Sequence, residues 1–501
     1  MLLHMISLTG RVELIPEKEG EDRFQQFIWE TLGTTMTEKL FPKQLRVVHN
    51  VIYPPVPLNF SLSLLSLTET GKGLTCVFYT VLSMEVAEAS VSLFSSAGIG
   101  DLGIEYGCGI PVAISAELLD DRADLIEANY PHCTVIRGDL RKTKGEVVKS
   151  WQRNFPKKRP KVMTLSPPCQ GMSTNGAGKI AAQVRKGKRP KEDERNKLLL
   201  EGLEVVRVLQ PEHFLIENVP NMKNTVVTWK NNKPKRLIDL IVPAIGKGYT
   251  LHSFVVDFAN YGVPHFRKRL ITIGKRTQQG PSTMNEHKSP PSWFDSGGIE
   301  EYITVRQAIG NRYRTCKKDV LHQMPKMNLK HVEWARHIPK GSGETAHMNA
   351  CTICAQVDDF KIVTCTKCGK PLPRPQTLNP DGTRRAIRGY KTSYRRMLPN
   401  QPANTITMNS GVPSSDVKLH FSQPRVLTLL EIMILSSLRN IENPQMRVKT
   451  DYPWNGKYSF ESAMEPKDYL LQKNIIRQAL GESIPPLGMQ RMIRSLLNDW
   501  P

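Results

Sequence analysis

The chain has 501 residues, 39% of them hydrophobic and 23% charged, and its formal net charge at pH 7 is +22. Nine cysteines are too few for a disulfide framework, and the longest apolar runs, such as residues 74–84, are too short to cross a bilayer. These features exclude a disulfide-rich secreted scaffold and a membrane-spanning protein. The N-terminal stretch MLLHMISLTGRVELIPEKEG also lacks the pattern of a signal peptide, so we expect a cytoplasmic protein of two or three domains.

The excess of positive charge indicates what kind of molecule the protein binds, but it says little about the fold. A generally cationic surface would explain it, but a net charge of +22 favours nucleic acid as the partner. The charge does not distinguish DNA from RNA.

Residues 1–83 carry no pattern that identifies a domain. They contain short apolar runs and a proline cluster at residues 53–57. The character of the sequence changes at Met84, after which the first regular pattern begins.

Strands and helices alternate in the next part of the chain. A strand over residues 91–94 leads into a turn with Gly98 and Gly100 and then a helix. A further helix is predicted within 118–131, and further strands are predicted in the segments 112–117, 133–140, 161–170, 213–220 and 251–274. This alternation predicts a doubly wound, Rossmann-like α/β sheet, which binds ligands at the carboxyl ends of its strands.

The α/β pattern stops at about residue 276. Residues 276–420 are rich in proline, glycine, histidine and basic residues. Helical patterns return in residues 426–438, 466–480 and 489–497. No internal repeat is present in the sequence.

Three features at successive predicted strand ends indicate a nucleotide-type cofactor. The Gly98 and Gly100 turn lets the backbone approach a ligand, although glycine also serves packing there. Glu117 would bind ribose hydroxyls, unless it is a solvated strand-end acid. Asp139 would take an adenine amino group, unless it is a helix N-cap. Together they favour an adenosine-type cofactor without separating a dinucleotide from S-adenosylmethionine.

A cysteine in an unusual loop indicates covalent chemistry. Cys169 lies in SPPCQGMS, residues 166–173, after an apolar strand, which suits a nucleophile, although a lone cysteine is usually a small buried hydrophobe. Glu217 lies between apolar residues at the end of another strand, where burial would raise its pKa and let it donate a proton. Arg267 and Arg269 share one face of a strand, which could also be a basic edge strand.

Taken together, the motifs and their order along the chain resemble those of the C5-cytosine methyltransferase family. The resemblance spans residues 91 to about 490, apart from the middle insert. The motifs, in chain order, are FSSAGIGDLG (94–103), SPPCQG (166–171), ENV (217–219), YGVPHFRKR (261–269), PRVLTLLE (424–431) and GESIPP (481–486). The resemblance implies an S-adenosylmethionine-dependent DNA methyltransferase. It implies a catalytic and cofactor-binding domain over 84–275, a smaller target-recognition region over 276–420, and a segment over 421–501 that returns to the catalytic domain. Members of the family usually reach the cofactor loop within a few residues of their start, so we interpret residues 1–83 as a dispensable N-terminal extension or an upstream mis-start, with Met84 as the alternative start.

The resemblance also implies a mechanism. The Cys169 thiolate would add to C6 of cytosine, and Glu217 would hold and protonate N3. Arg269 would bind O2, while Arg267 would brace the loop and DNA phosphates. The cytosine must leave the duplex to reach the thiol, so base flipping is implied.

The cofactor residues follow from the same resemblance. Glu117 would hold the ribose, Leu118 would pack on the adenine, and Asp139 would take its amino group. The other implied cofactor-binding residues are Phe94, Gly98, Gly100, Pro168 and Ser483. Residues 184–199 resemble a mobile basic loop that closes over DNA, although a solvated charged linker has the same composition.

The sequence departs from the family pattern at three places. His265 stands where the family has glutamine, and Glu482 stands where it has asparagine, which adds a negative charge near the cofactor. The segment after PRVLTLLE reads ILSSL instead of the usual Arg-Leu-Gln. We expect these departures to affect cofactor affinity or closure more than the chemical step.

Four cysteines in the middle region have metal-ligand spacing. The motifs CTIC and CTKC place Cys351, Cys354, Cys365 and Cys368 as two hooks of a structural zinc site within residues 351–368. Four unrelated thiols are improbable at this spacing. We interpret the cluster as a ribbon-like module that braces the target-recognition region.

Three alternative functions fit parts of the sequence. The tRNA-acting branch of the family shares PPCQ and ENV, but its recognition region is short. A catalytically silent zinc-containing DNA-binding protein would not need Cys169, Glu217, Arg267 and Arg269 together. A nicotinamide dehydrogenase would use the glycine turn only. We therefore expect duplex DNA as the substrate, no membrane, a monomer, and a possible cognate restriction endonuclease.

Overall fold

The computed structural model describes residues 66–70, 73–77, 88–172, 193–229, 233–277, 280–294, 301–310, 320–387, 392–439, 452 and 466–498. The expected extension, residues 1–83, therefore lies outside the described residues except for a hairpin of β1 (Ser66–Thr70) and β2 (Gly73–Val77). The expected basic loop, residues 184–199, is described only from residue 193 onward.

An eight-stranded sheet has the strand order β12-β10-β11-β7-β6-β3-β4-β5. Its strands are β3 (Ser90–Leu93), β4 (Val112–Glu117), β5 (Thr134–Arg137), β6 (Val162–Leu165), β7 (His213–Asn218), β10 (Tyr249–Asp257), β11 (Lys268–Arg276) and β12 (Thr283–Glu286). The strands from β5 to β7 pair in parallel. β11 is antiparallel to both β7 and β10, so the predicted α/β sheet is mixed rather than wholly parallel.

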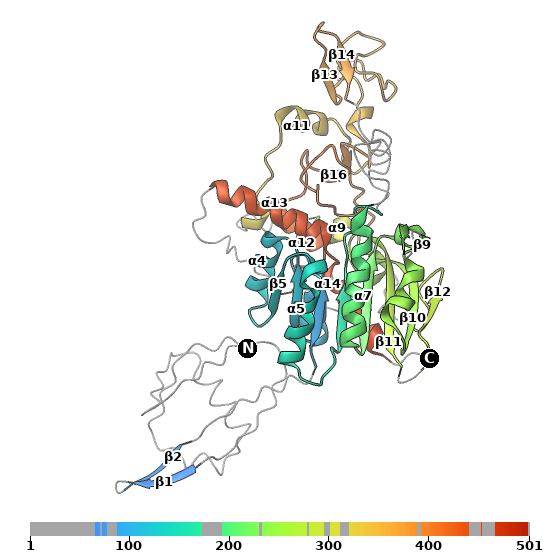
Figure 1. Ribbon diagram of the computed structural model, residues 1–501. Helices are drawn as coiled ribbons and strands as arrows, with labels where there is room; N and C mark the ends of the chain where they lie inside the picture. Colours follow the sequence, from blue (N-terminus) through green and yellow to red (C-terminus); the bar gives the residue numbers. More distant parts are fainter. Residues whose placement is uncertain are drawn as a thin grey trace. The chain divides into compact units, whose positions relative to one another are not determined.

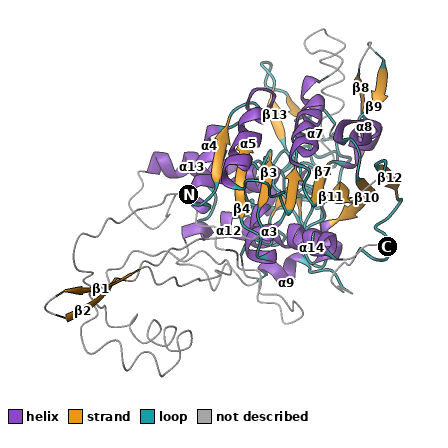
Figure 2. Cartoon of the chain, turned by 60° about the horizontal axis from the view of Figure 1, so that its bottom comes forward, coloured by secondary structure: helices purple, strands orange, loops and turns teal. Residues whose placement is uncertain are grey.

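The central strands are short apolar runs because both of their faces are covered. Every residue of β3, β6 and β7 is buried. Helices α5 (Leu140–Asn154) and α7 (Leu198–Leu209) share one core with the sheet, and they lie side by side along it in Figure 1. Helices α3 (Asp101–Cys108) and α14 (Pro486–Leu497) form another core on the opposite face, as Figure 2 shows.

The last helix packs very closely against the first helix of the sheet domain. A Cβ atom on Gly103 of α3 would lie only 2.2 Å from the carbonyl oxygen of Pro486. A glycine is therefore required where these two segments meet, although they stand far apart in the sequence. This contact brings the C-terminal segment back onto the sheet domain.

The remaining elements are mostly short. They are α4 (Asp120–Asn129), β8 (Val226–Thr228), β9 (Pro234–Arg236), α8 (Ile241–Ile245), α9 (Val305–Ile309), α11 (Leu329–Arg336), β13 (Gln376–Leu378), β14 (Arg384–Ala386), β15 (Arg395–Arg396), β16 (Val417–Leu419), α12 (Leu429–Leu435) and α13 (Pro466–Glu482). A small core around Trp334, Tyr394 and Leu419 supports the part of the chain that carries the four-cysteine cluster. The helical patterns predicted near 426–438, 466–480 and 489–497 correspond to α12, α13 and α14.

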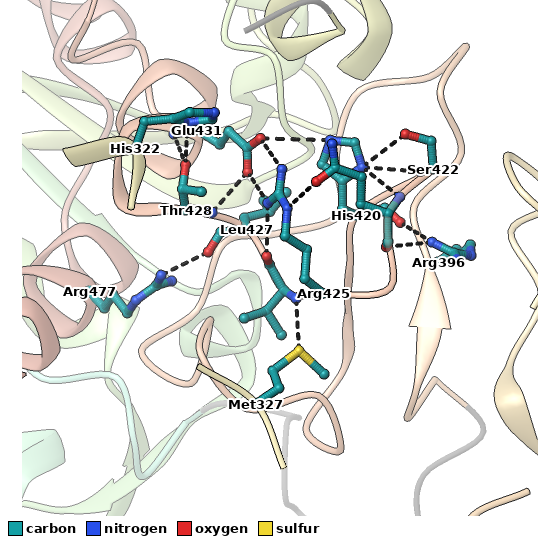
Figure 3. A network of polar contacts seen from close by, with 12 residues as sticks. His322, Met327, Arg396, His420, Ser422, Arg425, Leu427, Thr428, Glu431 and Arg477 are labelled. Carbon is teal, nitrogen blue, oxygen red and sulfur yellow. Dashed lines mark hydrogen bonds and ion pairs between the residues drawn. The ribbon is translucent and has the colours of Figure 1, made fainter. Parts of the chain in front are cut away.

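A buried polar network holds the start of α12 (Figure 3). The guanidinium of Arg425 donates to both carboxylate oxygens of Glu431, at 2.7 and 2.8 Å. Thr428 caps α12 and forms a capping box with Glu431. Arg396 of β15 donates to the carbonyl of His420 at 2.7 Å, and so connects β15 to the same network. The charges of Arg425 and Glu431 are buried but paired, which is the condition under which buried charges are tolerated.

Candidate active site

The loops after four parallel strands meet at one edge of the sheet. β3, β4, β6 and β7 end near each other because their pairing aligns Leu93 with Ala116 and Leu165, and Leu165 with Ile216. This edge carries the predicted glycine turn, Glu117, the cysteine loop and Glu217. Ligands bind at this edge in open α/β sheets.

The cysteine loop is fastened to the neighbouring strand end by Asn218. Its side-chain amide donates to the carbonyl of Pro167 at 3.1 Å, and its Oδ1 atom accepts from the backbone N–H of Val219 at 2.8 Å. The carbonyl of Cys169 accepts from the N–H of Met172 at 2.9 Å. Pro168 and Cys169 lie half-buried in this loop. Cys169 is therefore held in a fixed turn directly beside the end of β7.

Glu217 forms an ion pair with one of the two predicted arginines. The Nε atom of Arg269 lies 2.6 Å from Oε1 of Glu217, and both side chains are largely buried. β7 and β11 are antiparallel neighbours, with Glu217 opposite Ile271, so the pair is set by the sheet itself. The predicted burial of Glu217 is present, and Arg269 compensates its charge there.

The Cys169 thiol is protonated in this environment at neutral pH. Burial raises the pKa of Cys169 above its ordinary value, and the Glu217 carboxylate raises it further. The cations Arg269 and Arg267 act in the opposite direction but do not reverse the shift. The thiolate form is thus scarce in the protein without ligands.

Arg267 does not lie where the resemblance implied. Its guanidinium is 1% exposed and donates to the carbonyls of Ile406, Gly481 and Glu482 at 2.9 to 3.2 Å. Burial lowers the pKa of Arg267 to about 9, so the group is still a cation at neutral pH. Arg267 braces the chain from within, and the expectation that it contacts DNA phosphates is wrong because its side chain does not reach the surface.

Glu117 is held by backbone donors at the end of β4. Its Oε2 atom accepts from the N–H of Ser96 at 2.8 Å, and its Oε1 atom accepts from the N–H groups of Leu118 and Leu119 at 2.9 and 3.0 Å. A carboxylate has about four acceptor positions, and the three N–H groups take three of them, so Glu117 can still accept from a ligand hydroxyl. Leu118 beside it has a 58% exposed side chain. The acceptor that Glu117 presents fits a ribose hydroxyl of an adenosine-type cofactor.

The turn after β3 has a strained backbone. Phe94 and Ser96 adopt φ values of 60° and 49°, a region that residues other than glycine rarely occupy. Gly98 has φ 68°, and a Cβ there would lie 2.6 Å from the ring of Tyr130. Packing against Tyr130 is therefore a sufficient reason for glycine at position 98, and the approach of a ligand is a second one. Gly100 occupies the N-cap position of α3.

Two other predicted cofactor residues already have partners. Asp139 caps α5 and forms an ion pair with Arg141, at 2.5 Å between Oδ2 and Nη2. This geometry agrees with the N-cap interpretation, and an adenine contact stays a prediction. The hydroxyl of Ser483 donates to the carbonyl of Ala479 at 2.7 Å, at the end of α13, and is buried.

The four-cysteine cluster is compact. The sulfur atoms of Cys351, Cys354, Cys365 and Cys368 all lie within 4.8 Å of one another. Tetrahedral zinc–thiolate bonds of about 2.3 Å place the sulfur atoms roughly 3.8 Å apart. The Sγ atoms of Cys351 and Cys368 lie 3.5 Å apart, as do those of Cys354 and Cys365. The cluster therefore has the ligand type, number and spacing for a structural zinc ion.

A buried arginine supports this cluster. Arg374 donates to the carbonyls of Asn349, Asp358, Asp359 and Ile362 at 2.7 to 3.0 Å. Three of these carbonyls lie between the two cysteine hooks, so the guanidinium fixes their separation. The sequence did not predict the roles of Arg374 and Asn218, because a buried arginine or asparagine is not distinguishable by type from an exposed one.

His265 is neutral and buried. Both ring nitrogens are enclosed without a hydrogen-bond partner among the described residues. Burial and the nearby cations Arg267, Arg269 and Lys418 lower the pKa of His265 well below its usual range. This departure from the family pattern adds no charge to the site.

The comparisons with known proteins cover most of the chain. The family model described as C-5 cytosine-specific DNA methylase matches residues 89–438. Type II methyltransferase M1.HgaI from Avibacterium volantium is 28% identical over 429 residues, which cover 82% of this chain and 98% of that protein. Type II methyltransferase M1.HphI from Haemophilus parahaemolyticus is 25% identical over an alignment that covers 81% of this chain and 86% of that protein. Type II methyltransferase M.AquIA from Picosynechococcus sp. is 31% identical over 44% of this chain and 86% of that protein. No helix in the described part of the chain is long and apolar enough to span a membrane.

Proposed function

Because this chain belongs to the C-5 cytosine-specific DNA methylase family, we propose that it methylates C5 of a cytosine in duplex DNA with Cys169 as the covalent nucleophile. The observation that carries the proposal is the position of Cys169 in a loop held by Asn218, beside the ion pair of Glu217 and Arg269. A nucleophile, an acid and a cation thus meet at the ligand-binding edge of the sheet.

The residues divide the chemistry between them. The proton of the Cys169 thiol passes to the Glu217 carboxylate, directly or through water, and the resulting thiolate adds to C6 of the flipped cytosine, which makes C5 nucleophilic. Glu217 hydrogen-bonds N3 and the exocyclic amine, gives the proton it received from Cys169 to N3 as the adduct forms, and takes it back when the sulfur leaves. Arg269 stays on Glu217 and turns its other N–H groups toward O2. After methylation the C5 proton passes to water, the Cys169 sulfur leaves C6, and the aromatic ring is restored.

S-adenosylmethionine supplies the electrophilic methyl group when it is bound. Glu117 would hold its ribose hydroxyls, and Leu118 would cover the adenine. The exposed face of Asp139 would accept from the adenine amino group. The backbone of the turn at Phe94, Gly98 and Gly100, together with Pro168 and Ser483, would complete the pocket. These assignments rest on the shared edge of the sheet and on the motif order.

We infer that residues 276–420 recognise the DNA target and that one zinc ion on the cysteine cluster stabilises this region. The hairpin of β13 and β14 next to the cluster carries the exposed cations Arg384 and Arg385, which suit DNA phosphates or guanine edges. We also infer that the enzyme acts as a monomer and that a restriction endonuclease with the same target accompanies it. The second inference rests on the type II class of the relatives.

Transfer of labelled methyl groups tests the function. Purified protein, S-adenosylmethionine labelled in its methyl group, and either unmethylated duplex DNA or unmodified tRNA are incubated, with Cys169→Ser as the control. We expect label in the DNA only, and none with the variant. Label confined to tRNA would move the enzyme to the tRNA-acting branch. No label from folded protein that still binds DNA would favour a silent DNA-binding protein.

A further inference from the structure

Glu482, where the family has asparagine, has a buried arginine as its partner. The Nε atom of Arg122 lies 3.2 Å from Oε2 of Glu482, and its Nη2 atom lies 3.4 Å from Oε1. Arg122 is 1% exposed and belongs to α4, whereas Glu482 ends α13. The added negative charge is therefore matched by a cation that the fold brings to it.

The same carboxylate holds the strained turn of the predicted cofactor pocket. Oε2 of Glu482 also accepts from the hydroxyl of Ser96 at 3.1 Å. Ser96 has φ 49°, and its N–H is the group that donates to Glu117. A residue in this backbone region persists only where its surroundings hold it. Ser96 is held by two carboxylates, Glu117 on its N–H and Glu482 on its hydroxyl.

The backbone of Glu482 connects this assembly to the catalytic side of the site. Its carbonyl accepts from Nη2 of Arg267 at 2.9 Å. Arg267 shortly precedes Arg269, which pairs with Glu217. One residue thus touches both the turn after β3 and the segment that leads into the catalytic strand β11.

We propose that Glu482 and Arg122 form a positioning pair that fixes Ser96, and with it Glu117, in the geometry that binds S-adenosylmethionine. The proposal rests on the proposed function for the identity of the ligand. Removing the Glu482 charge leaves Arg122 buried without its full partner, and removing Arg122 leaves the Glu482 charge close to that of Glu117. Removing both leaves neither defect, and the carboxylate of Asp121, which also pairs with Arg122 at 3.0 Å, is 40% exposed and can be solvated by water instead.

Binding of S-adenosylhomocysteine to the full chain, measured by calorimetry, tests the pair without requiring methylation or DNA. We expect Glu482→Gln and Arg122→Gln each to weaken binding about 10-fold, and the double variant to recover to within about 3-fold of the wild type, because contacting residues are non-additive. In methylation assays, we expect the KM for S-adenosylmethionine to rise in the single variants while kcat changes less than about 2-fold, a split that a loss of fold would not produce. Lys144→Gln, which removes a partly exposed pair with Glu201 and Glu204 between α5 and α7, is the matched control.

Ser96→Ala tests the same contact if the Glu482 or Arg122 variants fail to fold. It removes only the hydroxyl that meets Glu482, and we expect about 3-fold weaker binding with an unchanged melting temperature. The proposal would be overturned if the single variants or Ser96→Ala bound S-adenosylhomocysteine like the wild type. It would also be overturned if the loss of affinity in the double variant were the product of the two single losses. In that case wild-type methylation of DNA would leave the proposed function standing, so the two failures are distinguishable.

Discussion

Glu217 and Arg269 lie on adjacent antiparallel strands, with Oε1 of the acid 2.6 Å from Nε of the arginine. The pair is largely buried, so each side chain fixes the other at the end of β7. Because Cys169 lies in the loop beside it, the same pair affects both the reactivity of the thiol and the protonation of the substrate ring.

Glu217→Gln removes the acid while keeping its shape. We expect the rate of methyl transfer to fall about 100- to 10,000-fold, the range of general acid catalysis, with little change in affinity for DNA. Single-turnover methylation and a DNA-binding titration measure the two effects. Glu212→Gln, in the exposed acid just before the same strand, is the control and should retain full activity. A Glu217→Gln enzyme with nearly wild-type activity would remove Glu217 from the mechanism.

The thiol of Cys169 should titrate at high pH in the protein without ligands. Its pKa is raised by burial and by Glu217, so the thiolate fraction, and with it the rate of alkylation by iodoacetamide, should still be rising above the ordinary cysteine value of about 8.5. Mass spectrometry of the Cys169 peptide over a pH series gives the midpoint. In Glu217→Gln the midpoint should move to lower pH, because a nearby negative charge is lost, even though methylation is slower. A wild-type midpoint below the ordinary cysteine value would contradict this account of the site.

Buried neutral histidines should make stability depend on pH. Burial lowers the pKa of His420 to about 3 and that of His213 to about 4. The unfolded chain takes up these protons near pH 6.5, so the stability they contribute is present above about pH 6.5 and is lost as the pH falls toward about 4. Each group costs about 1.4 kcal/mol per pH unit over that interval.

His420→Asn tests this pH dependence. Asparagine keeps an acceptor for the N–H groups of Ser422 and Gln423, which Nδ1 of His420 now accepts, but it does not titrate. We expect the melting temperature to fall less steeply with decreasing pH than in the wild type. The partly exposed His337 pairs with Glu333 of α11, and His337→Asn should not reduce the slope in this way. Equal slopes for His420→Asn and the wild type would show that His420 is protonated in the folded protein.

Metal analysis tests the cysteine cluster. We expect one zinc ion per chain in protein purified without chelators. Release of this ion by a strong chelator should lower the melting temperature. It should also abolish DNA binding at chelator concentrations that still leave cofactor binding intact. Cys365→Ser should reproduce the loss, whereas Cys108→Ser, a cysteine outside the cluster, should not. Metal-free protein that melts and binds DNA like the purified protein would refute a structural role for zinc.

The sequence predicted the strands of the sheet well where the residues of the strand itself carry the pattern. β4 occupies the predicted residues 112–117, because a short apolar run followed by an acid and a helix has few other solutions. The four cysteines were predictable as a cluster because both short hooks lie within the single stretch 351–368. The comparisons bear out the family and the DNA methyltransferase function.

The sequence did not predict the relationships that depend on distant pairing. Arg267 and Arg269 were expected to share one face of a strand, but β11 begins at Lys268, and Arg267 is buried against three carbonyls while Arg269 pairs with Glu217. Whether such an arginine faces DNA or the interior depends on segments that lie far along the chain, such as those of Ile406 and Gly481. The pairing of Glu482 with Arg122 is likewise visible only once α4 and α13 lie together, and so a departure from the family pattern proved to have its compensating partner elsewhere in the chain.

The most direct test of the central claim is covalent trapping of Cys169 on DNA. A long unmethylated duplex containing 5-fluorocytosine is incubated with the enzyme and S-adenosylmethionine, and the denatured products are separated by size and digested for mass spectrometry. Because fluorine at C5 cannot leave as a proton does, the elimination step is blocked and the adduct persists. We predict a denaturation-resistant complex whose single modified peptide carries the nucleotide on Cys169, and none with Cys169→Ser. A complex attached through another residue, or methylation of ordinary DNA by Cys169→Ser, would contradict the account.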